Sequence, residues 1–83
     1  ENLPSILISE EELKDKITII DLIVLSRLES SKSAIKRLIK SNGIRINNQI
    51  ITDEKLIVTK DLFQDNLIKL SLGKKRHIKV ELS

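Results

Sequence analysis

The sequence predicts an α+β domain in which two to three short helices pack on a small, mostly antiparallel sheet of hairpins. Residues 32–40 repeat apolar positions with the period of a helix. Residues 44–51 and 67–82 instead alternate apolar and polar positions on either side of turn-forming residues, as paired strands do. Because the chain has 83 residues, we expect one domain with little interior to spare for a deep active site.

The helix predicted at residues 32–40 separates positive charge from apolar surface. On a helical wheel its polar side chains share one arc, namely Lys32, Ser33, Lys36, Arg37 and Lys40. The opposite arc is apolar and contains Ala34, Ile35, Leu38 and Ile39. We therefore expect this helix to bury one side and to present a cationic ridge on the other.

Turn-forming residues mark the ends of this helix and the hairpin that follows it. Ser31 is the expected N-cap, and Gly43 is expected to end the helix in the left-handed conformation. Asn47 and Asn48 can supply the positive φ angles of a two-residue hairpin turn. Arg45 stands between two isoleucines in the first strand, so it should point to the solvent face.

The distribution of charge indicates a polyanionic partner. Residues 31–49 contain five Lys or Arg residues and no acid, although the net charge of the whole chain is only +3. Residues 1–30 carry three basic and seven acidic residues, whereas residues 31–83 carry twelve basic and five acidic ones. A nucleic acid would dock on the basic part. Phe63 is the only aromatic residue, which excludes an RNA-binding sheet built on aromatic stacking.

Several other functions are disfavoured by composition. The chain has no cysteine, so disulfides, thiol nucleophiles and cysteine-bound zinc are excluded, and His77 stands alone without the partners of a metal site. We expect His77 to be an ordinary strand-surface residue. No apolar run approaches the ~20 residues of a membrane-spanning helix, and we expect a soluble, cytoplasmic protein. The absence of methionine suggests a piece of a longer polypeptide.

The N-terminal part is expected to connect this domain to an upstream one. Residues 1–8 suggest a linker, and Ser9 with Glu12 fits a capping box for a short helix that ends near Lys16. We therefore divide the chain into residues 1–17, linker and short helix, and residues 18–83, the domain. Thr18 should cap a second helix over residues 19–28, whose apolar face would consist of Ile19, Leu22, Ile23, Leu25 and Leu28.

The segment between the two hairpins gives weaker signals. Residues 56–58 suggest a short strand or extended crossing, and residues 59–62 one helical turn that places Leu62 or Phe63 in the core. Asp65 and Asn66 suggest a turn.

The apolar faces of the second hairpin predict its register. Burying both apolar sets pairs residue 68 with 82, 70 with 80, and 72 with 78, which places Lys69 opposite Glu81. Lys74, Lys75 and Arg76 then form a three-residue tip. These cations have no predicted internal partner, which favours a phosphate ligand, with a merely solubilising tip as the alternative.

Four segments resemble a known family. The strings SKSAIKRLIK, NG, IRINNQIITD and GKKRHIKVEL occur in the order found in the C-terminal domain of bacterial-type tyrosyl-tRNA synthetases, which has the alpha-L RNA-binding fold of small-subunit ribosomal protein four. The resemblance covers residues 18–82. Asn42-Gly43 stands where the family often has Gly-Gly, and Asn47-Asn48 where it commonly has Asn-Gly. The aromatic residue often found after the Gly-Lys-Lys tip is missing.

This resemblance implies the context of the domain. The complete enzyme would be a homodimeric class I aminoacyl-tRNA synthetase that attaches tyrosine to its tRNA with ATP, in an upstream Rossmann-type catalytic domain. We expect no catalytic residue and no cofactor in these 83 residues, and a monomeric fragment that holds the variable arm and anticodon region of the tRNA. The predicted RNA-binding residues are Ser31, Lys32, Ser33, Lys36, Arg37, Lys40, Arg45, Asn47, Lys74, Lys75, Arg76 and Lys79.

Two other interpretations stay open at this point. The same fold occurs in ribosomal-RNA-binding modules and as an appendage of RNA-modifying enzymes such as pseudouridine synthases. Alternatively, the apolar surface of residues 1–28 could make this a protein-interaction domain.

Overall fold

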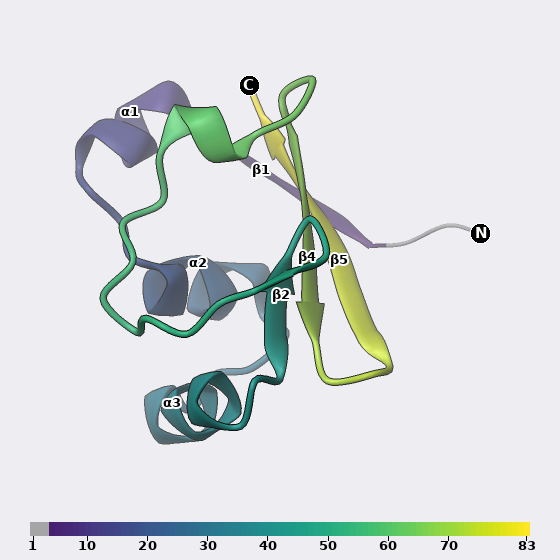
Figure 1. Ribbon diagram of the computed structural model, residues 1–83. Helices are drawn as coiled ribbons and strands as arrows, with labels where there is room; N and C mark the ends of the chain where they lie inside the picture. The colour runs from purple at the N-terminus through teal and green to yellow at the C-terminus, as the bar shows by residue number, and fades with distance from the viewer. Residues whose placement is uncertain (1–3) are drawn as a thin grey trace.

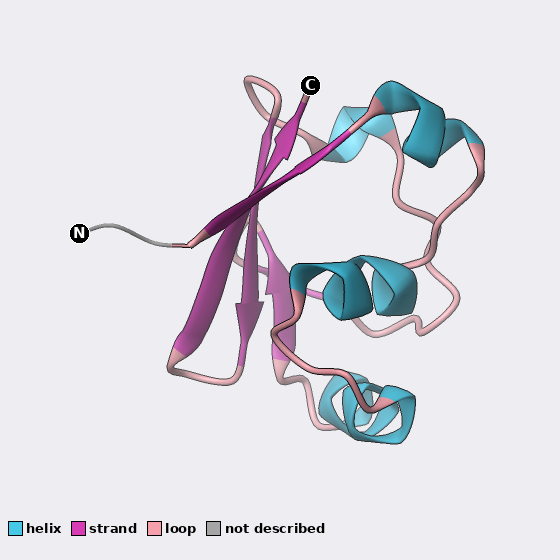
Figure 2. Cartoon of the chain, turned by 180° about the vertical axis from the view of Figure 1, so that it is seen from behind, coloured by secondary structure: helices cyan, strands magenta, loops and turns pink. Residues whose placement is uncertain are grey.

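A computed structural model describes residues 4–83 and places three helices on one face of a five-stranded sheet (Figure 1). The α+β prediction is confirmed. The part of the predicted linker at residues 1–3 lies outside the described residues. In both Figure 1 and Figure 2 the sheet is seen nearly edge-on, with all helices on the same side of it. No helix among residues 4–83 is long and apolar enough to cross a membrane.

The sheet is antiparallel except at one edge. Its strands are β1 (Ser5–Ile8), β2 (Ile44–Ile46), β3 (Gln49–Ile50), β4 (Leu67–Leu72) and β5 (Arg76–Leu82). Their spatial order is β1-β5-β4-β2-β3, and only β1 runs parallel to its neighbour. The two predicted hairpins therefore lie side by side, joined through β2 and β4.

Strand β1 lies within the segment that was predicted to be a linker. Ser5–Ile8 pairs with residues 79–82 of β5, and Ile8 is almost fully buried. Two of its four residues, Ile6 and Ile8, lie on the core side, whereas Leu7 is 65% exposed. Four residues are too few to show alternation when three of them are apolar, so the sequence pattern did not reveal this strand.

The helices begin where the capping residues predict. Helices α1 (Glu10–Lys14) and α2 (Ile19–Ser26) both start with capping boxes, formed by Ser9 with Glu12 and by Thr18 with Asp21. Helix α2 ends at Ser26, two residues before the predicted end, and Arg27 takes a left-handed φ of 64°. Leu25 was predicted on the apolar face of α2 but is 45% exposed, and Ile20 is buried instead.

Helix α3 (Lys32–Lys40) ends differently from the prediction. The left-handed residue is Asn42, with φ 62°, and not Gly43. The amide of Gly43 donates to the Leu38 carbonyl at 2.7 Å and that of Asn42 to the Ile39 carbonyl at 3.1 Å, the two bonds of a Schellman motif. A Cβ at Gly43 would lie 3.1 Å from Cδ2 of Leu38, so a larger residue there would require the Leu38 side chain to shift.

The core is mainly aliphatic and lies between the sheet and the helices. Ile19, Leu22, Ile23, Ile35 and Ile39 of α2 and α3 face the apolar side chains of β2, β4 and β5. Residues 56–58 cross beside α2, where the Ile19 amide donates to the Leu56 carbonyl at 2.9 Å. The predicted helical turn is the 3₁₀ helix Lys60–Leu62, and Phe63, just after it, enters the core.

The two short turns follow the prediction. Asn47 and Asn48 have φ 51° and 70°, so the first hairpin forms without the family's glycine. Asp65 and Asn66 likewise have positive φ, 53° and 63°, before β4 begins.

The register of the second hairpin differs from the prediction by two residues. Ile68 pairs with Val80, Leu70 with Ile78 and Leu72 with Arg76. The loop consists of residues 73–75, and Gly73 supplies its positive φ of 66°. A shift of two leaves every side chain on its predicted face, so the apolar pattern could not distinguish the two registers. The predicted Lys69–Glu81 pair is therefore wrong: Lys69 lies opposite Lys79.

Candidate RNA-binding site

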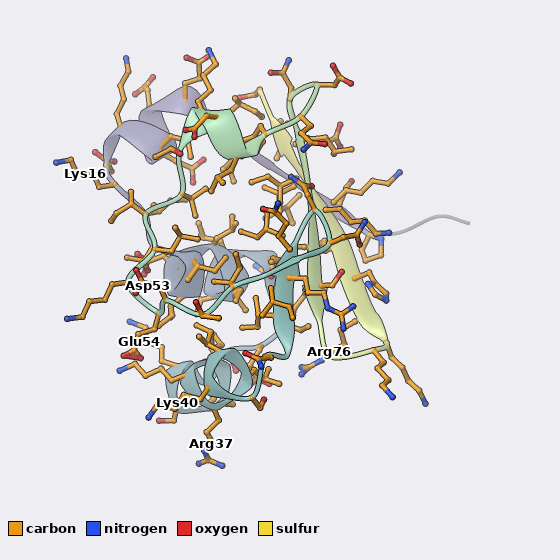
Figure 3. All side chains as sticks on the ribbon, viewed as in Figure 1. Lys16, Arg37, Lys40, Asp53, Glu54 and Arg76 are labelled. Atoms are coloured by element: carbon orange, nitrogen blue, oxygen red, sulfur yellow. The ribbon has the colours of Figure 1, made fainter. Side chains whose placement is uncertain are left out.

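Helix α3 presents the predicted row of cations. The side chains on its polar arc are all exposed, namely Lys32, Ser33, Lys36, Arg37 and Lys40, while Ile35 and Ile39 on the other side are buried. Ser31 caps the helix, its hydroxyl oxygen accepting the Ala34 amide at 3.2 Å. Figure 3 shows Arg37 and Lys40 projecting from α3 at one end of the molecule.

The hairpin tip lies beside α3 at this same end. The amide of Gly73 donates to the Gly43 carbonyl at 2.7 Å, which joins the tip to the loop after α3. Lys74 and Lys75 are exposed on this tip. We call the exposed cations of α3 and the β4–β5 hairpin end the helix–tip surface: Lys32, Lys36, Arg37, Lys40, Lys74, Lys75 and Arg76.

Arg76 differs from the two lysines because it has internal partners. It belongs to β5, and its Nη1 donates to the Leu28 carbonyl at 3.0 Å and to Glu29 Oε1 at 3.2 Å. The second oxygen of Glu29 accepts the Ser31 amide at 3.1 Å. The prediction of three cations without an internal partner is thus wrong for Arg76, which ties β5 to the turn before α3.

These contacts border a shallow groove along α3. It has a volume of about 390 Å³ and is lined by Glu29, Ala34, Arg37, Leu38, Ser41 and Arg76. The guanidinium groups of Arg37 and Arg76 and the hydroxyl of Ser41 therefore line this groove together with the apolar carbon atoms of Ala34 and Leu38. The pKa of Glu29 is lowered below its ordinary value, mainly by the hydrogen bond that the Ser31 amide donates and next by the one that Arg76 donates. This side chain is therefore an anion at neutral pH.

Three further cations lie on the sheet face turned away from the helices. Arg45 and Lys79 are exposed between buried neighbours of β2 and β5, and Lys69 of β4 lies directly opposite Lys79. Lys69 was not predicted as a site residue, and the predicted register placed it opposite Glu81. Arg45 is level with Ser71, one row nearer the hairpin tip than the two lysines. The cations of this sheet face therefore begin close to the end of the molecule that carries the helix–tip surface.

Asn47 occupies a structural position. Its Nδ2 donates to the Leu62 carbonyl at 3.0 Å, and its Oδ1 accepts the Lys69 amide at 2.9 Å. The side chain is half-buried between the first hairpin turn and β4. These bonds hold the turn to the sheet and occupy both polar ends of the amide, so the Asn47 side chain has a structural role.

His77 is more engaged than an ordinary surface residue. It is half-buried, with Nδ1 2.9 Å from the Ser71 hydroxyl and Nε2 3.1 Å from the Lys74 carbonyl. Because a carbonyl only accepts, Nε2 carries a hydrogen, and the ring supports the hairpin tip.

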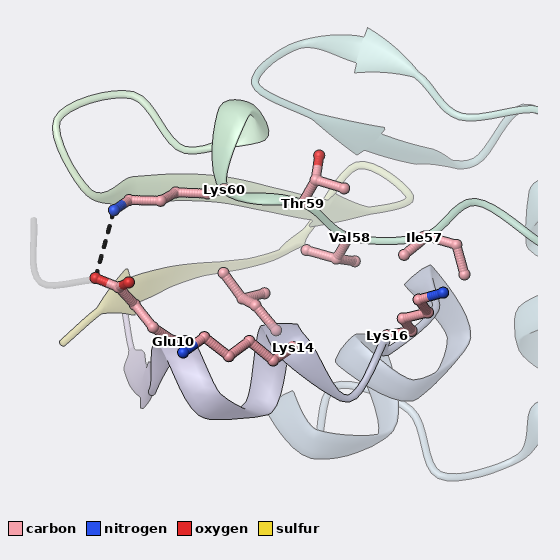
Figure 4. Close-up of a pocket in the computed structure, with 8 residues that line it drawn as sticks. Glu10, Lys14, Lys16, Ile57, Val58, Thr59 and Lys60 are labelled. Carbon is pink, nitrogen blue, oxygen red and sulfur yellow. Dashed lines mark hydrogen bonds and ion pairs between the residues drawn. The ribbon is translucent and has the colours of Figure 1, made fainter.

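A larger groove lies away from all predicted site residues. It has a volume of about 520 Å³ and runs between α1 and residues 57–60. Figure 4 shows Glu10 and Lys60 paired across one end of it, 3.4 Å apart. Its exposed lining is mainly apolar and includes Leu13, Ile57 and Val58; its cations are Lys14, Lys16 and Lys60, of which Lys60 is paired with Glu10.

Fold and surface together define a class of protein: a small α+β domain with a cationic helix and hairpin tip and, among residues 4–83, no buried unpaired polar side chain. Comparison with known proteins gives the family. The sequence model of the tyrosine–tRNA ligase SYY-like C-terminal domain matches residues 1–80. The chain belongs to this family.

Three relatives illustrate the similarity. The chain is 63% identical over 82 residues to the tyrosine–tRNA ligase of Pelagibacter ubique (strain HTCC1062), covering 99% of this chain and 20% of that protein. It is 45% identical over 82 residues to the ligase of the Wolbachia subspecies from Brugia malayi (strain TRS), covering 98% of this chain and 20% of that protein. It is 42% identical over 83 residues to the ligase of Rickettsia massiliae (strain Mtu5), again covering 99% and 20%. The chain thus spans about a fifth of these relatives' length.

Proposed function

We propose that this domain binds tyrosine tRNA on behalf of a tyrosine–tRNA ligase. The observation that supports this most is the helix–tip surface, on which seven exposed cations gather at one end of the fold. Glu29, the acid that lines the groove along α3, is paired with Arg76. Like charges held this close repel one another without stabilising the fold, whereas the phosphates of an RNA backbone would neutralise them.

The proposed contacts are electrostatic and follow the shape of an RNA stem. Lys32, Lys36, Arg37 and Lys40 would meet phosphates along one strand, and Lys74 and Lys75 would meet the facing strand. The exposed Ser33 hydroxyl and the first amides of α3, beside Ser31, would receive a further phosphate, since helix N-termini attract anions. Arg45 and Lys79 would extend these contacts onto the sheet face. Recognition would depend on backbone shape and 2′-hydroxyl groups, because the chain offers no aromatic platform for bases.

The catalytic part of the reaction would lie elsewhere in the polypeptide. We propose that an upstream domain of the same chain binds ATP and tyrosine and transfers tyrosine to the tRNA, that the complete enzyme is a homodimer in the cytoplasm, and that the isolated domain is a monomer. The name shared by the relatives supports this division of labour, since all carry the same domain within a protein about five times as long. A ribosomal-RNA-binding or RNA-modifying context is less well supported, because the matching family model is that of the ligase.

A titration with tyrosine tRNA tests the proposal. A transcript with its long variable arm should bind more tightly than one with the arm deleted, and both more tightly than ribosomal RNA fragments of equal length. If about five phosphates are neutralised, the logarithm of the affinity should fall with the logarithm of the salt concentration with a slope of about −3.5 to −4.5. An affinity independent of salt, or equal for all three RNAs, would contradict the proposal.

A further inference from the structure

Glu29 is an acid placed within a surface of positive charge. No other acid occurs in residues 22–52. The side chain of Glu29 is 23% exposed and lines the groove along α3. Considered as a charge alone, Glu29 should repel a phosphate and weaken RNA binding. Its contacts suggest the opposite effect.

The carboxylate of Glu29 joins two elements that are far apart in sequence. One oxygen pairs with Arg76 of β5 at 3.2 Å, and the other accepts the amide of Ser31, the N-cap of α3, at 3.1 Å. Arg76 also donates to the Leu28 carbonyl, so two hydrogen bonds hold the turn before α3 to β5. Because Glu29 is ionised at neutral pH, both bonds of its carboxylate are charge-assisted.

A second connection fixes the other end of α3. Gly43, just beyond the helix, accepts the amide of Gly73 at the start of the tip loop. Both ends of α3 are therefore tied to the β4–β5 hairpin, one through Glu29 and one through Gly43. Together the two ties determine the spacing between the cations of α3 and Lys74 and Lys75 of the tip. A preset spacing lowers the cost of ordering these side chains when both meet one ligand.

We propose that Glu29 is a positioning residue that strengthens RNA binding despite its negative charge, by holding α3 at a fixed distance from the hairpin tip. This inference rests on the proposed RNA-binding function. Glu29 itself would not touch the RNA. Arg76 would act chiefly through Glu29 rather than as a free phosphate contact like Lys74.

The substitution Glu29→Gln separates positioning from charge, because the two effects have opposite signs. It removes one negative charge from the domain, so a purely electrostatic role predicts tighter binding of a tyrosine tRNA transcript. The positioning role predicts binding weaker by about threefold or more, as expected when a member of one hydrogen-bond network is removed. Glu81→Gln is the matched control: Glu81 is exposed on the outer sheet face, and its substitution should leave affinity unchanged or tighten it.

Two further variants complete the test. In an Arg76→Gln background, Glu29→Gln should weaken binding less than it does in the unaltered chain, because the ion pair is already absent and only the bond to the Ser31 amide is still affected. Glu29→Asp keeps the charge but has a shorter side chain that cannot make both bonds at once, so it should weaken binding too, and it serves as the test if the Gln variant is poorly folded. Circular dichroism at the assay temperature accompanies each titration.

The outcomes distinguish this inference from the proposed function. If the unaltered chain fails to bind the transcript, the proposed function is overturned. If the unaltered chain binds, but Glu29→Gln tightens binding as Glu81→Gln does, only the positioning role is overturned.

Discussion

Lys69 lies directly opposite Lys79 on the outward face of the sheet, an arrangement in which two like charges are cross-strand neighbours. Like charges in such a position are destabilising, whereas an oppositely charged cross-strand pair contributes about 0.2–1 kcal/mol of stability. Lys69→Glu should therefore raise the free energy of unfolding while it lowers the affinity for tRNA. Urea unfolding and an RNA titration on the same variant measure the two effects. An unchanged affinity would place this sheet face outside the RNA-binding surface.

The double substitution Lys36→Glu with Arg37→Glu tests α3 directly. Both side chains are exposed, so the thermal unfolding midpoint should remain nearly unchanged while RNA affinity falls. The salt dependence should also become shallower, by about 0.7–0.9 in slope for each phosphate that the variant no longer neutralises. Lys14→Glu with Lys16→Glu makes the same change in charge at two exposed positions in and just after α1, at the other end of the molecule from α3, and should weaken binding less (Figure 3). Equal weakening by the two double variants would mean that net charge alone governs binding.

Asn47 should matter for folding more than for RNA. Asn47→Gly keeps the positive φ of 51° without strain but removes the side-chain bonds to Leu62 and Lys69. We expect the free energy of unfolding to fall by about 0.5–1.5 kcal/mol for each of these bonds. Asn48→Gly, at the neighbouring position with φ 70°, should be nearly neutral or stabilising. Equal effects at the two positions in urea unfolding would show that the side-chain bonds of Asn47 contribute nothing.

The sequence predicted the elements better than their pairing. Caps such as Ser31 and Thr18 are local signals, because the side chain bonds to an amide three residues away, and these predictions were confirmed. The register of β4 and β5 depends on the loop geometry around Gly73, which alternation does not encode. Without that geometry, Lys69 could not be recognised as part of the cationic sheet face.

The sequence pattern also could not predict contacts between segments that lie far apart in the chain. Nothing in the sequence near Glu29 indicates Arg76, 47 residues away, as its partner. Likewise the edge strand β1 forms by pairing with β5 at the other end of the chain. In the observed register Arg76 pairs with Leu72, which is buried, so the Arg76 side chain lies on the side of the sheet that faces the helices. The correct register would therefore have suggested an internal partner for Arg76.

The packed side of α3 should behave oppositely to its cationic side. Ile35 is fully buried in the core, so Ile35→Ala should lower the free energy of unfolding by about 2–5 kcal/mol through the cavity it leaves. Leu38→Ala should cost less, since Leu38 is only half-buried. RNA affinity per folded molecule should stay unchanged in both. If Leu38→Ala destabilised the domain more than Ile35→Ala in urea unfolding, Ile35 would not be the more deeply packed of the two residues.

The Arg76–Glu29 ion pair should give the domain a pH-dependent contribution to stability. The pKa of Glu29 is lowered below its ordinary value of 4.5 by the Ser31 amide and by Arg76, so the unfolded chain binds a proton at this site more readily than the folded one. The contribution is thus present above pH 4.5 and is lost as the pH falls through the pKa of the folded state. We expect the difference in free energy of unfolding between the unaltered chain and Glu29→Gln to be constant near neutral pH. As the solution is acidified to about pH 3, the free energy of unfolding of the unaltered chain should fall relative to that of Glu29→Gln. This relative fall should be smaller in an Arg76→Gln background, where one of the two hydrogen bonds is gone. A difference that does not change on acidification would show that the folded chain does not favour the ionised form of Glu29.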